Sequence, residues 1–318
     1  MKRRRFLGAL GAGLAAAAAP QWLSAAAAAR ADEAYDEAYV ERWSWAMGQP
    51  VHLRLFARSE DAGYEAAQLA LAELRRVEAV LSWFDDASDL SELNRMAGRG
   101  GLVAAPDLLA VVGAATAFQR TTAGAFDAAV EPLMRAWGFH APRASAPTAA
   151  ELAEARAAVH AARIEMRGRR VTLGSATTQL DFGGIGVGYG LDRAAEVLRA
   201  RGIRRALLDV SGDCLALGAP PGEPGWLVEI ADPDRPRAVL GATRLRDAAL
   251  ATSSNLVSVV RYGRAVRGHV MDPDRGVPAT GCRQVTVVAR TGLEADALST
   301  AMLVSPRRFN GVLRFYQA

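Results

Sequence analysis

The stretch Asp181-Phe182-Gly183-Gly184-Ile185-Gly186-Val187-Gly188-Tyr189-Gly190-Leu191-Asp192 places five glycines within eight residues and leads into a helix expected over residues 191–201. Glycines let another group approach the backbone closely, and a helix N-terminus offers free N–H groups to an anion. The segment therefore fits a phosphate or pyrophosphate. Its spacing matches neither the dinucleotide fingerprint nor the P-loop, and tight helix–sheet packing explains the glycines equally well.

Strands and helices alternate on both sides of this segment, without strict β-α-β regularity. Periodicity and capping signals predict helices at residues 62–83, 106–121, 149–160 and 191–201. They predict strands at residues 51–56, 206–210, 226–230, 256–260 and 285–288, and a hairpin at residues 164–173. The order of these elements predicts a mixed α+β fold.

Composition excludes several classes of protein. The chain has 318 residues, 51% of them hydrophobic and 23% charged, which allows a sizeable core and rules against a disordered chain. Residues 1–31 hold five basic side chains and no acidic one, so the net charge of +4 becomes −1 for the remainder, with 33 basic against 34 acidic residues. A nucleic-acid-binding function therefore has no electrostatic support. Cys214 and Cys282 are too few for a disulfide scaffold, and we expect free thiols.

Residues 1–31 have the pattern of an export signal. A basic start precedes an apolar run, and Ala29-Arg30-Ala31 resembles a cleavage site. Arg3-Arg4-Arg5-Phe6-Leu7 resembles a twin-arginine signal, used for cargo that is already folded; an ordinary secretory signal is the alternative. The apolar run is shorter than the ~20 residues that a membrane span needs. We expect an exported, periplasmic protein that is soluble after cleavage, with one domain over residues 32–318.

A carboxylate and a hydroxyl are four residues apart near the C-terminus. If Glu294–Met302 is a helix, Asp296 and Thr300 share one face. Hard oxygen ligands of this kind suit Mg²⁺, which usually completes its shell with water and substrate phosphates. The alternative is an ordinary helix with a solvated Asp296 and with Thr300 bonded to its own turn.

Two further segments carry polar groups in turn-forming contexts. Gly124-Ala125-Phe126-Asp127 could stack a planar ring and bond its edge, or could supply a core Phe and a capping Asp. In Arg267-Gly268-His269-Val270-Met271-Asp272-Pro273, an expected strand followed by a turn, His269 is a possible base and Asp272 could orient it or act itself. A lone His in a strand also has a purely structural explanation.

In this order, the four segments closely resemble the ApbE family, the FAD:protein FMN transferases. The resemblance extends from Ala46-Met47-Gly48 to Ala301-Met302-Leu303-Val304. Its motifs are matched by Ser82-Trp83-Phe84, Ser91-Glu92-Leu93-Asn94, Gly124 to Asp127, Pro132-Leu133, Trp137-Gly138-Phe139, residues 181–192, Ala251-Thr252-Ser253, His269 to Pro273, and Ala295 to Thr300. The resemblance implies an ApbE-like, two-lobed α+β fold with mixed sheets, flanking helices and a ligand cleft between the lobes.

The resemblance also implies roles for individual residues. Side-chain oxygens of Asp296 and Thr300, with backbone carbonyls of Gly186 and Ser299, would hold Mg²⁺. His269 or Asp272 would accept the proton of the attacking hydroxyl. Contacts to FAD would come from Met47, Trp83, Ala125, Phe126, Asp127, Gly183, Tyr189 and Asp192.

The function implied by the resemblance is Mg²⁺-dependent transfer of FMN from FAD to a Thr or Ser hydroxyl of an acceptor protein, with release of AMP. The acceptor would lie on the extracytoplasmic side, for example in a membrane redox complex. Two other hypotheses share the same motifs: an FAD pyrophosphatase that uses water as nucleophile, and an exported FAD-binding protein without catalysis.

The chain departs from the family pattern at four places. Gln49 replaces a Thr, Val187 replaces a common Lys, and Ser254 replaces a common Gly. After Val304 the usual closing helix and strand look incomplete. None of these departures removes an expected metal ligand, and they bear on turnover more than on flavin binding.

Overall fold

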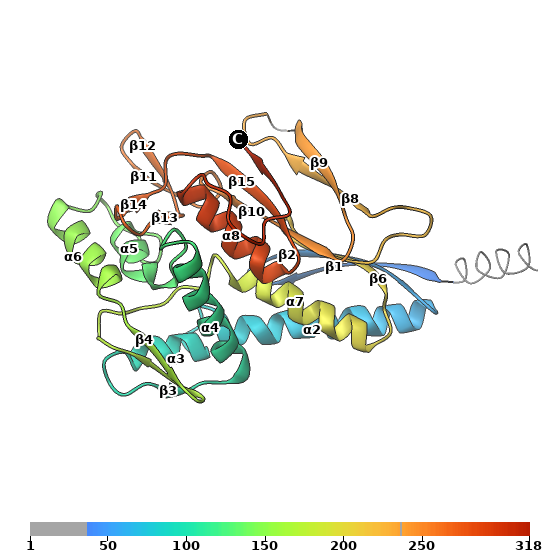
Figure 1. Ribbon diagram of the computed structural model, residues 1–318, viewed down its shortest axis with the longest axis horizontal. Coiled ribbons are helices and arrows are strands. Elements are labelled where there is room, and N and C mark those ends of the chain that lie inside the picture. Colours follow the sequence, from blue (N-terminus) through green and yellow to red (C-terminus); the bar gives the residue numbers. More distant parts are fainter. Residues whose placement is uncertain (1–36, 236) are drawn as a thin grey trace, which may run out of the picture. The chain divides into compact units, whose positions relative to one another are not determined.

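The chain is built around a seven-stranded antiparallel sheet, seen in a computed structural model that describes residues 37–235 and 237–318 (Figure 1). Residues 38–318 form one unit, and the expected export signal lies outside the described residues. Across the sheet the strands run β1 (Ala38–Ala46), β2 (Gln49–Ala57), β6 (Arg205–Val210), β7 (Asp213–Leu217), β10 (Ala248–Ser254), β15 (Gln284–Ala289) and β16 (Arg314–Gln317).

Helices cover one face of this sheet and a hairpin covers the other. The helices α2 (Glu60–Leu81), α7 (Gly186–Ala200) and α8 (Gly292–Val304) lie along one face (Figure 1), where Leu208 and Leu215 enter the main core. On the opposite face, Leu207 and Cys214 pack with the hairpin of β8 (Trp226–Ala231) and β9 (Val239–Leu245). Because side chains alternate along a strand, β6 and β7 supply both cores, and this explains their apolar sequences.

A second group of elements packs beside the main body, around its own core. Its helices are α3 (Asp89–Arg95), α4 (Pro106–Thr121), η1 (Ala128–Val130), α5 (Glu131–Ala136) and α6 (Ala149–His160). Its strands are β3 (Leu102–Val103), β4 (Ile164–Arg167) and β5 (Arg170–Leu173), with the hairpins β11 (Val259–Tyr262)–β12 (Ala265–Gly268) and β13 (Met271–Asp272)–β14 (Val277–Pro278) nearby. This mixture confirms the expected α+β class.

Most of the expected elements are confirmed. The helix expected at residues 106–121 has those bounds, and the helix at 149–160 is held at its start by a capping box between Thr148 and Glu151. Both cysteines are buried free thiols, as expected. The prediction of an incomplete C-terminus was wrong in one respect, because a strand, β16, does form there. It pairs with β15 and is the last strand of the sheet.

Three sequence predictions of local structure are corrected. Helix α7 begins at Gly186, not at residue 191, and it therefore includes three of the five glycines. His269 is not in a strand but follows β12, which ends at Gly268. The strand expected at residues 256–260 begins only at Val259. Several strands were not predicted, among them β1, β7, β9 and β10.

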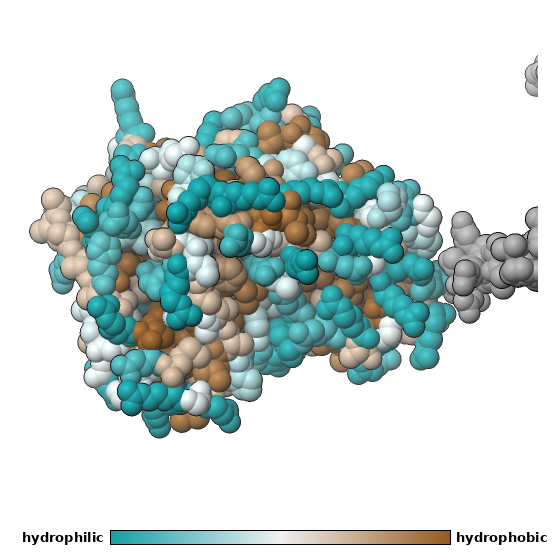
Figure 2. Space-filling view, in the orientation of Figure 1, coloured by the Kyte–Doolittle hydropathy of each residue, from teal (hydrophilic) through white to brown (hydrophobic). Residues whose placement is uncertain are grey.

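The surface shown in Figure 2 is hydrophilic over most of its area, with apolar patches between the charged side chains. Within the described residues, every helix is too short or too polar to cross a bilayer.

Candidate active site

The glycine segment packs directly against helix α8. A Cβ added to Gly184 would lie 2.9 Å from Thr300 Oγ1, and one added to Gly188 would lie 2.8 Å from the Cβ of Asp296. The Gly188 N–H donates to Asp296 Oδ2 at 3.0 Å. These two positions need glycine because no side chain fits in the interface. The fold thus brings together the segments predicted as a phosphate cradle and as a metal-binding pair.

A row of hydroxyl groups fixes the α8 side of this contact. Ser253, on β10, has its Oγ 3.1 Å from Thr300 Oγ1 and 2.7 Å from Ser299 Oγ. Ser299 Oγ in turn donates to the Asp296 carbonyl at 2.9 Å. The Thr300 hydroxyl is therefore oriented by a neighbouring strand, which favours a ligand role over the alternative of bonding within its own turn.

Two carboxyl groups, those of Asp296 and Asp213, are buried beside these hydroxyls. Burial raises the pKa of Asp296 to about 7, against the hydrogen bond from Gly188, which lowers it. Burial and the nearby Asp296 charge also raise the pKa of Asp213 well above its usual range, although the Thr252 N–H donates to Asp213 Oδ1 at 2.8 Å. Carboxylates that are buried close together favour a bound cation.

The donor set fits Mg²⁺ better than a metal caged entirely by protein. In the part of the chain that the structure describes, no three His, Cys, Asp or Glu side chains are grouped as a complete site. Asp296 and Thr300 supply one carboxylate and one hydroxyl, and Gly184, which has no Cβ, lets the backbone approach the Thr300 hydroxyl closely. Mg²⁺ commonly binds through one or two carboxylates and completes its shell with waters and substrate phosphates.

His269 lies in a loop held by Asn255. The Val270 N–H donates to Asn255 Oδ1 at 3.2 Å, and Asn255 Nδ2 donates to the Ala279 carbonyl at 2.8 Å. A Cβ on Gly268 would come within 2.5 Å of the Asn255 side chain, so glycine is needed there too. Asn255 thus clamps both neighbours of His269, a role that the sequence analysis did not assign.

The two candidate bases, His269 and Asp272, differ in whether their side-chain atoms already have hydrogen-bond partners. His269 has a buried Nδ1 without a hydrogen-bond partner, and burial lowers its pKa. In Asp272, Oδ1 already accepts the N–H groups of Asp274 at 3.1 Å and Arg275 at 2.9 Å, which hold the following turn. A neutral imidazole with a free nitrogen is the better proton acceptor, so the geometry favours His269.

A cleft of about 880 Å³ contains two of the expected flavin contacts and one of the two candidate bases. Ala125, Asp127 and Asp272 line it together. Asp127 also caps η1 by accepting the Ala129 N–H at 2.8 Å, whereas the Phe126 side chain is buried in the core. The sequence left a stacking Phe and a core Phe open, and the structure shows the core Phe.

The family model of the ApbE family matches residues 47–313. This chain belongs to the ApbE family. It is 29% identical over 279 residues to a FAD:protein FMN transferase of Treponema pallidum (strain Nichols), covering 81% of this chain and 76% of the relative. The ApbE protein from Thermotoga maritima matches with a TM-score of 0.77 and 28% identity over 84% of this chain and 87% of that one. The flavinyl transferase ApbE of Pseudomonas stutzeri, in its apo form, gives 0.73 and 26% over 85% of each chain.

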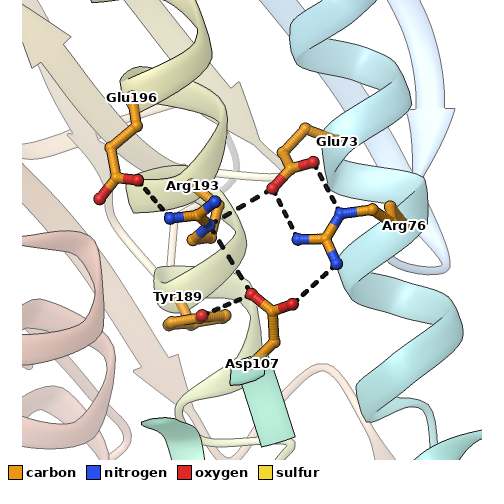
Figure 3. Close-up of polar contacts among 6 residues, drawn as sticks. All are labelled: Glu73, Arg76, Asp107, Tyr189, Arg193 and Glu196. Carbon is orange, nitrogen blue, oxygen red and sulfur yellow. Dashed lines mark hydrogen bonds and ion pairs between the residues drawn. The ribbon is translucent and has the colours of Figure 1, made fainter. Parts of the chain in front are cut away.

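In this ApbE-family protein, an ion network joins helices α2, α4 and α7 (Figure 3). Arg76 bridges Glu73 and Asp107 with contacts of 2.7 Å, and Arg193 contacts Glu73 at 3.3 Å and also Glu196. The Tyr189 hydroxyl donates to Asp107 Oδ1 at 2.6 Å. Tyr189 was expected only as a ligand contact, and its hydroxyl here joins two helices.

The expected flavin contacts of this ApbE-family protein do not all line one cavity. Tyr189 and Asp192 line a separate cavity of about 520 Å³. Met47 follows β1, and its N–H donates to Glu78 Oε2 at 2.8 Å. Gly183 is exposed, and its N–H donates to Asp181 Oδ1 at 2.6 Å.

Asp192 caps helix α8, which sequence reasoning missed. Its Oδ1 accepts the Gly292 N–H at 2.7 Å, and its Oδ2 accepts the Leu293 N–H at 2.9 Å. The two carboxylate oxygens thus satisfy N–H groups that a helix N-terminus leaves without partners. The cap begins one turn before Asp296 and fixes the end of the helix that carries the expected metal ligands.

We expect Asp192→Ala to lower the free energy of unfolding by about 1–2 kcal/mol, because both N–H groups lose their acceptor. Asp192→Asn keeps one carbonyl acceptor and should lose less. Urea unfolding followed by circular dichroism measures both changes. An Asp192→Ala variant as stable as the wild type would show that water replaces the cap without cost.

Proposed function

We propose that this protein transfers the FMN moiety of FAD to a Thr or Ser hydroxyl of an acceptor protein, using Mg²⁺ and releasing AMP. The coarser assignment follows from the family: the chain is an enzyme, an FAD:protein FMN transferase. The observation that carries the finer proposal is the contact between the glycine segment and the Asp296–Thr300 face of α8. It combines a glycine-lined stretch of backbone at a helix N-terminus with oxygen ligands for one cation.

Asp296 and Thr300, with the carbonyls of Gly186 and Ser299, would hold Mg²⁺ at this contact. When bound, the ion neutralises charge on the bridging and leaving oxygens of the diphosphate. The chain itself supplies orientation: Gly188 holds the Asp296 carboxylate, and Ser253 holds the Thr300 hydroxyl. Transfer of a phosphoryl-type group depends mainly on such positioning and on charge stabilisation.

His269 would accept the proton of the attacking hydroxyl. The new bond forms between that oxygen and the phosphorus of the FMN half. The bond from this phosphorus to the AMP oxygen breaks, and AMP leaves with the electron pair. His269 has a buried Nδ1 without a hydrogen-bond partner, and burial lowers the pKa of the ring. Both features favour the neutral imidazole, which can take up a proton. The expected export signal would deliver the enzyme to acceptors on the extracytoplasmic side.

The test mixes the purified protein, FAD and Mg²⁺ with an extracytoplasmic acceptor protein that exposes a Thr or Ser hydroxyl. We expect covalent flavin fluorescence on the acceptor in a denaturing gel, with one AMP released per flavin attached, and loss of both signals when a chelator is added. AMP release without an acceptor would instead show a pyrophosphatase. Stable FAD without AMP would show a binding protein, and either result would overturn the proposal.

A further inference from the structure

We propose that Asp107, on helix α4, is a positioning residue for the diphosphate site: through the Tyr189 hydroxyl it holds the glycine-rich first turns of α7 in place. Asp107 lies outside the expected ligand set, in the side-chain network of Figure 3. The inference deepens the proposed function and rests on it for its catalytic consequence.

The first turns of α7 have little helical stability of their own. Gly186, Gly188 and Gly190 fall within the first five residues of the helix, and after proline glycine is the least favourable residue in a helix. The N-cap residue, Ile185, offers no side-chain acceptor to the free N–H groups, and the first turn holds no acidic residue. Helix α8, by contrast, begins with the capping side chain of Thr291. The start of α7 therefore depends on contacts from other elements.

Two hydrogen bonds from neighbouring helices reach this start. The Gly188 N–H donates to Asp296 Oδ2 on α8 at 3.0 Å, and the Tyr189 hydroxyl donates to Asp107 Oδ1 on α4 at 2.6 Å. Tyr189 is the first polar side chain of α7, and its own N–H donates to the Ile185 carbonyl at 3.1 Å. Holding the Tyr189 ring therefore also holds the backbone turn from which Gly188 contacts Asp296.

Asp107 is itself fixed by arginines of two helices. Arg76 Nη1 donates to Asp107 Oδ2 at 2.7 Å, and the same guanidinium donates to both carboxylate oxygens of Glu73, at 2.8 and 2.7 Å. Arg193 Nε lies 3.7 Å from Asp107 Oδ1. The Asp107 side chain is only 9% exposed, and the hydrogen bond from Arg76 lowers its pKa against the opposing effect of burial. Asp107 is therefore a charged acceptor with a defined position.

The bond between Tyr189 and Asp107 is charge-assisted and joins two parts of the fold. Burial and the hydrogen bond to Asp107 raise the pKa of Tyr189, so the hydroxyl keeps its proton and acts as the donor. Such O–H···O⁻ bonds are stronger than bonds between neutral groups. Among the residues in Figure 3, Asp107 alone comes from α4, whereas the others lie on α2 and α7. Asp107 thus connects the start of α7 to the second group of elements.

Loss of this bond should loosen the start of α7 without unfolding the helix. Further along α7, Leu191 and Leu198 are buried in the main core and should keep the rest of the helix in place. At its start, the Gly188 N–H orients the Asp296 carboxylate, and the Gly186 carbonyl is an expected Mg²⁺ ligand. Displacement of a reacting group by about 1 Å can cost 10²-fold in rate, so a loosened first turn should slow transfer.

The test measures hydrogen exchange in the FAD-free protein and compares Tyr189→Phe with a matched control, Tyr316→Phe. Each variant removes one hydroxyl and keeps the ring; the Tyr316 hydroxyl donates to the Ala242 carbonyl at 3.2 Å and joins β16 to β9. In Tyr189→Phe we expect exchange over residues 186–190 to become about tenfold faster or more, with exchange over residues 194–200 as in the wild type. Tyr316→Phe should leave both segments unchanged.

Asp107→Ala gives the second arm, because a change at Asp107 does not remove an expected flavin contact. If both residues act through one bond, adding Tyr189→Phe to Asp107→Ala should accelerate exchange no further. Accelerations that multiply in the double variant would overturn the inference, as would wild-type exchange over residues 186–190 in Tyr189→Phe. The Tyr189→Phe result decides by itself if Asp107→Ala does not fold.

The transfer assay then separates positioning from a merely structural role. Tyr189→Phe and Asp107→Ala should each lower kcat by about tenfold and raise the Mg²⁺ concentration for half-maximal rate, whereas Tyr316→Phe should keep the wild-type values. Unchanged kcat and Mg²⁺ dependence in folded Tyr189→Phe would overturn the positioning role. Absence of transfer in the wild type would count against the proposed function only, since hydrogen exchange does not depend on activity.

Discussion

Asp296→Asn is expected to lower the rate of flavin transfer by about 10³-fold, because a metal ion at such a site supplies several kcal/mol of charge stabilisation and 1.36 kcal/mol is worth tenfold. The substitution keeps the shape of the side chain, and its amide oxygen can still accept the Gly188 N–H that Asp296 accepts at 3.0 Å. What it removes is the negative charge of the only carboxylate in the expected metal-binding set. The transfer assay at saturating FAD and over a range of Mg²⁺ concentrations measures the loss.

Asp296→Asn should lower the transfer rate but raise the stability of the metal-free protein above neutral pH. The raised pKa of Asp296, about 7 in the folded protein, means that its contribution to stability is full below the ordinary carboxyl range and is lost as the pH rises through about 7. The metal-free wild type should therefore lose stability over this interval, and the variant should lose less. Chemical unfolding at pH 5 and pH 8 without Mg²⁺ measures the difference.

Glu294→Gln is the matched control, because Glu294 lies on the same helix α8 but outside the expected ligand set. It should retain nearly the full transfer rate. The metal assignment fails if Asp296→Asn transfers flavin within tenfold of the wild type, or if Glu294→Gln loses as much activity.

Gly188→Ala is expected to produce the largest loss of stability of any substitution considered. The added Cβ would lie 2.2 Å from the Gly292 carbonyl oxygen and 2.8 Å from the Asp296 Cβ. Because the nearest atom belongs to the backbone of α8, relief requires that α7 and α8 move apart. Overpacking of this kind costs about 3 kcal/mol or more, and the melting temperature should fall by roughly 5 °C or more for a folded unit of this size.

Gly113→Ala supplies the comparison within a helix. Gly113 lies inside α4, where the nearest neighbour of an added Cβ is the Met166 side chain at 3.6 Å, an ordinary contact. Replacing a helical glycine where there is room stabilises by about 0.5–1 kcal/mol, so this variant should melt at or above the wild-type temperature. Equal melting temperatures for the two variants would mean that α7 and α8 do not pack as closely as the structure shows.

The start of α7 shows why local pattern alone misplaced an element boundary. Apolar periodicity begins only near Leu191, and glycines are poor helix formers, so the sequence predicted a later start. The helix begins at Gly186 because packing requires it: Gly188 can contact α8 only without a side chain, and its N–H is held by Asp296. Tertiary contacts here override propensity.

In the candidate site too, some residues could be predicted from local sequence and others only from the tertiary structure. The spacing of Asp296 and Thr300 placed both on one face of an expected helix, and the resemblance to the family implied their role as metal ligands. Asp192, Ser253 and Asn255 became identifiable as supports only when distant segments were placed beside α8 and His269. A single carboxylate, hydroxyl or amide has no local pattern that reveals such a partner.

The sequence by itself determined the α+β class, most helices and strands, the family and the residues expected to meet the diphosphate and the metal, because periodicity, capping and ordered motifs are local properties of the chain. Only the tertiary structure decided that His269 has a nitrogen without a partner whereas an oxygen of Asp272 holds a turn, that Phe126 belongs to the core, and that Asp181 lies between His140 and a glycine N–H. Burial and electrostatic environment depend on which remote segments pack together, and this sets the protonation and orientation of each group.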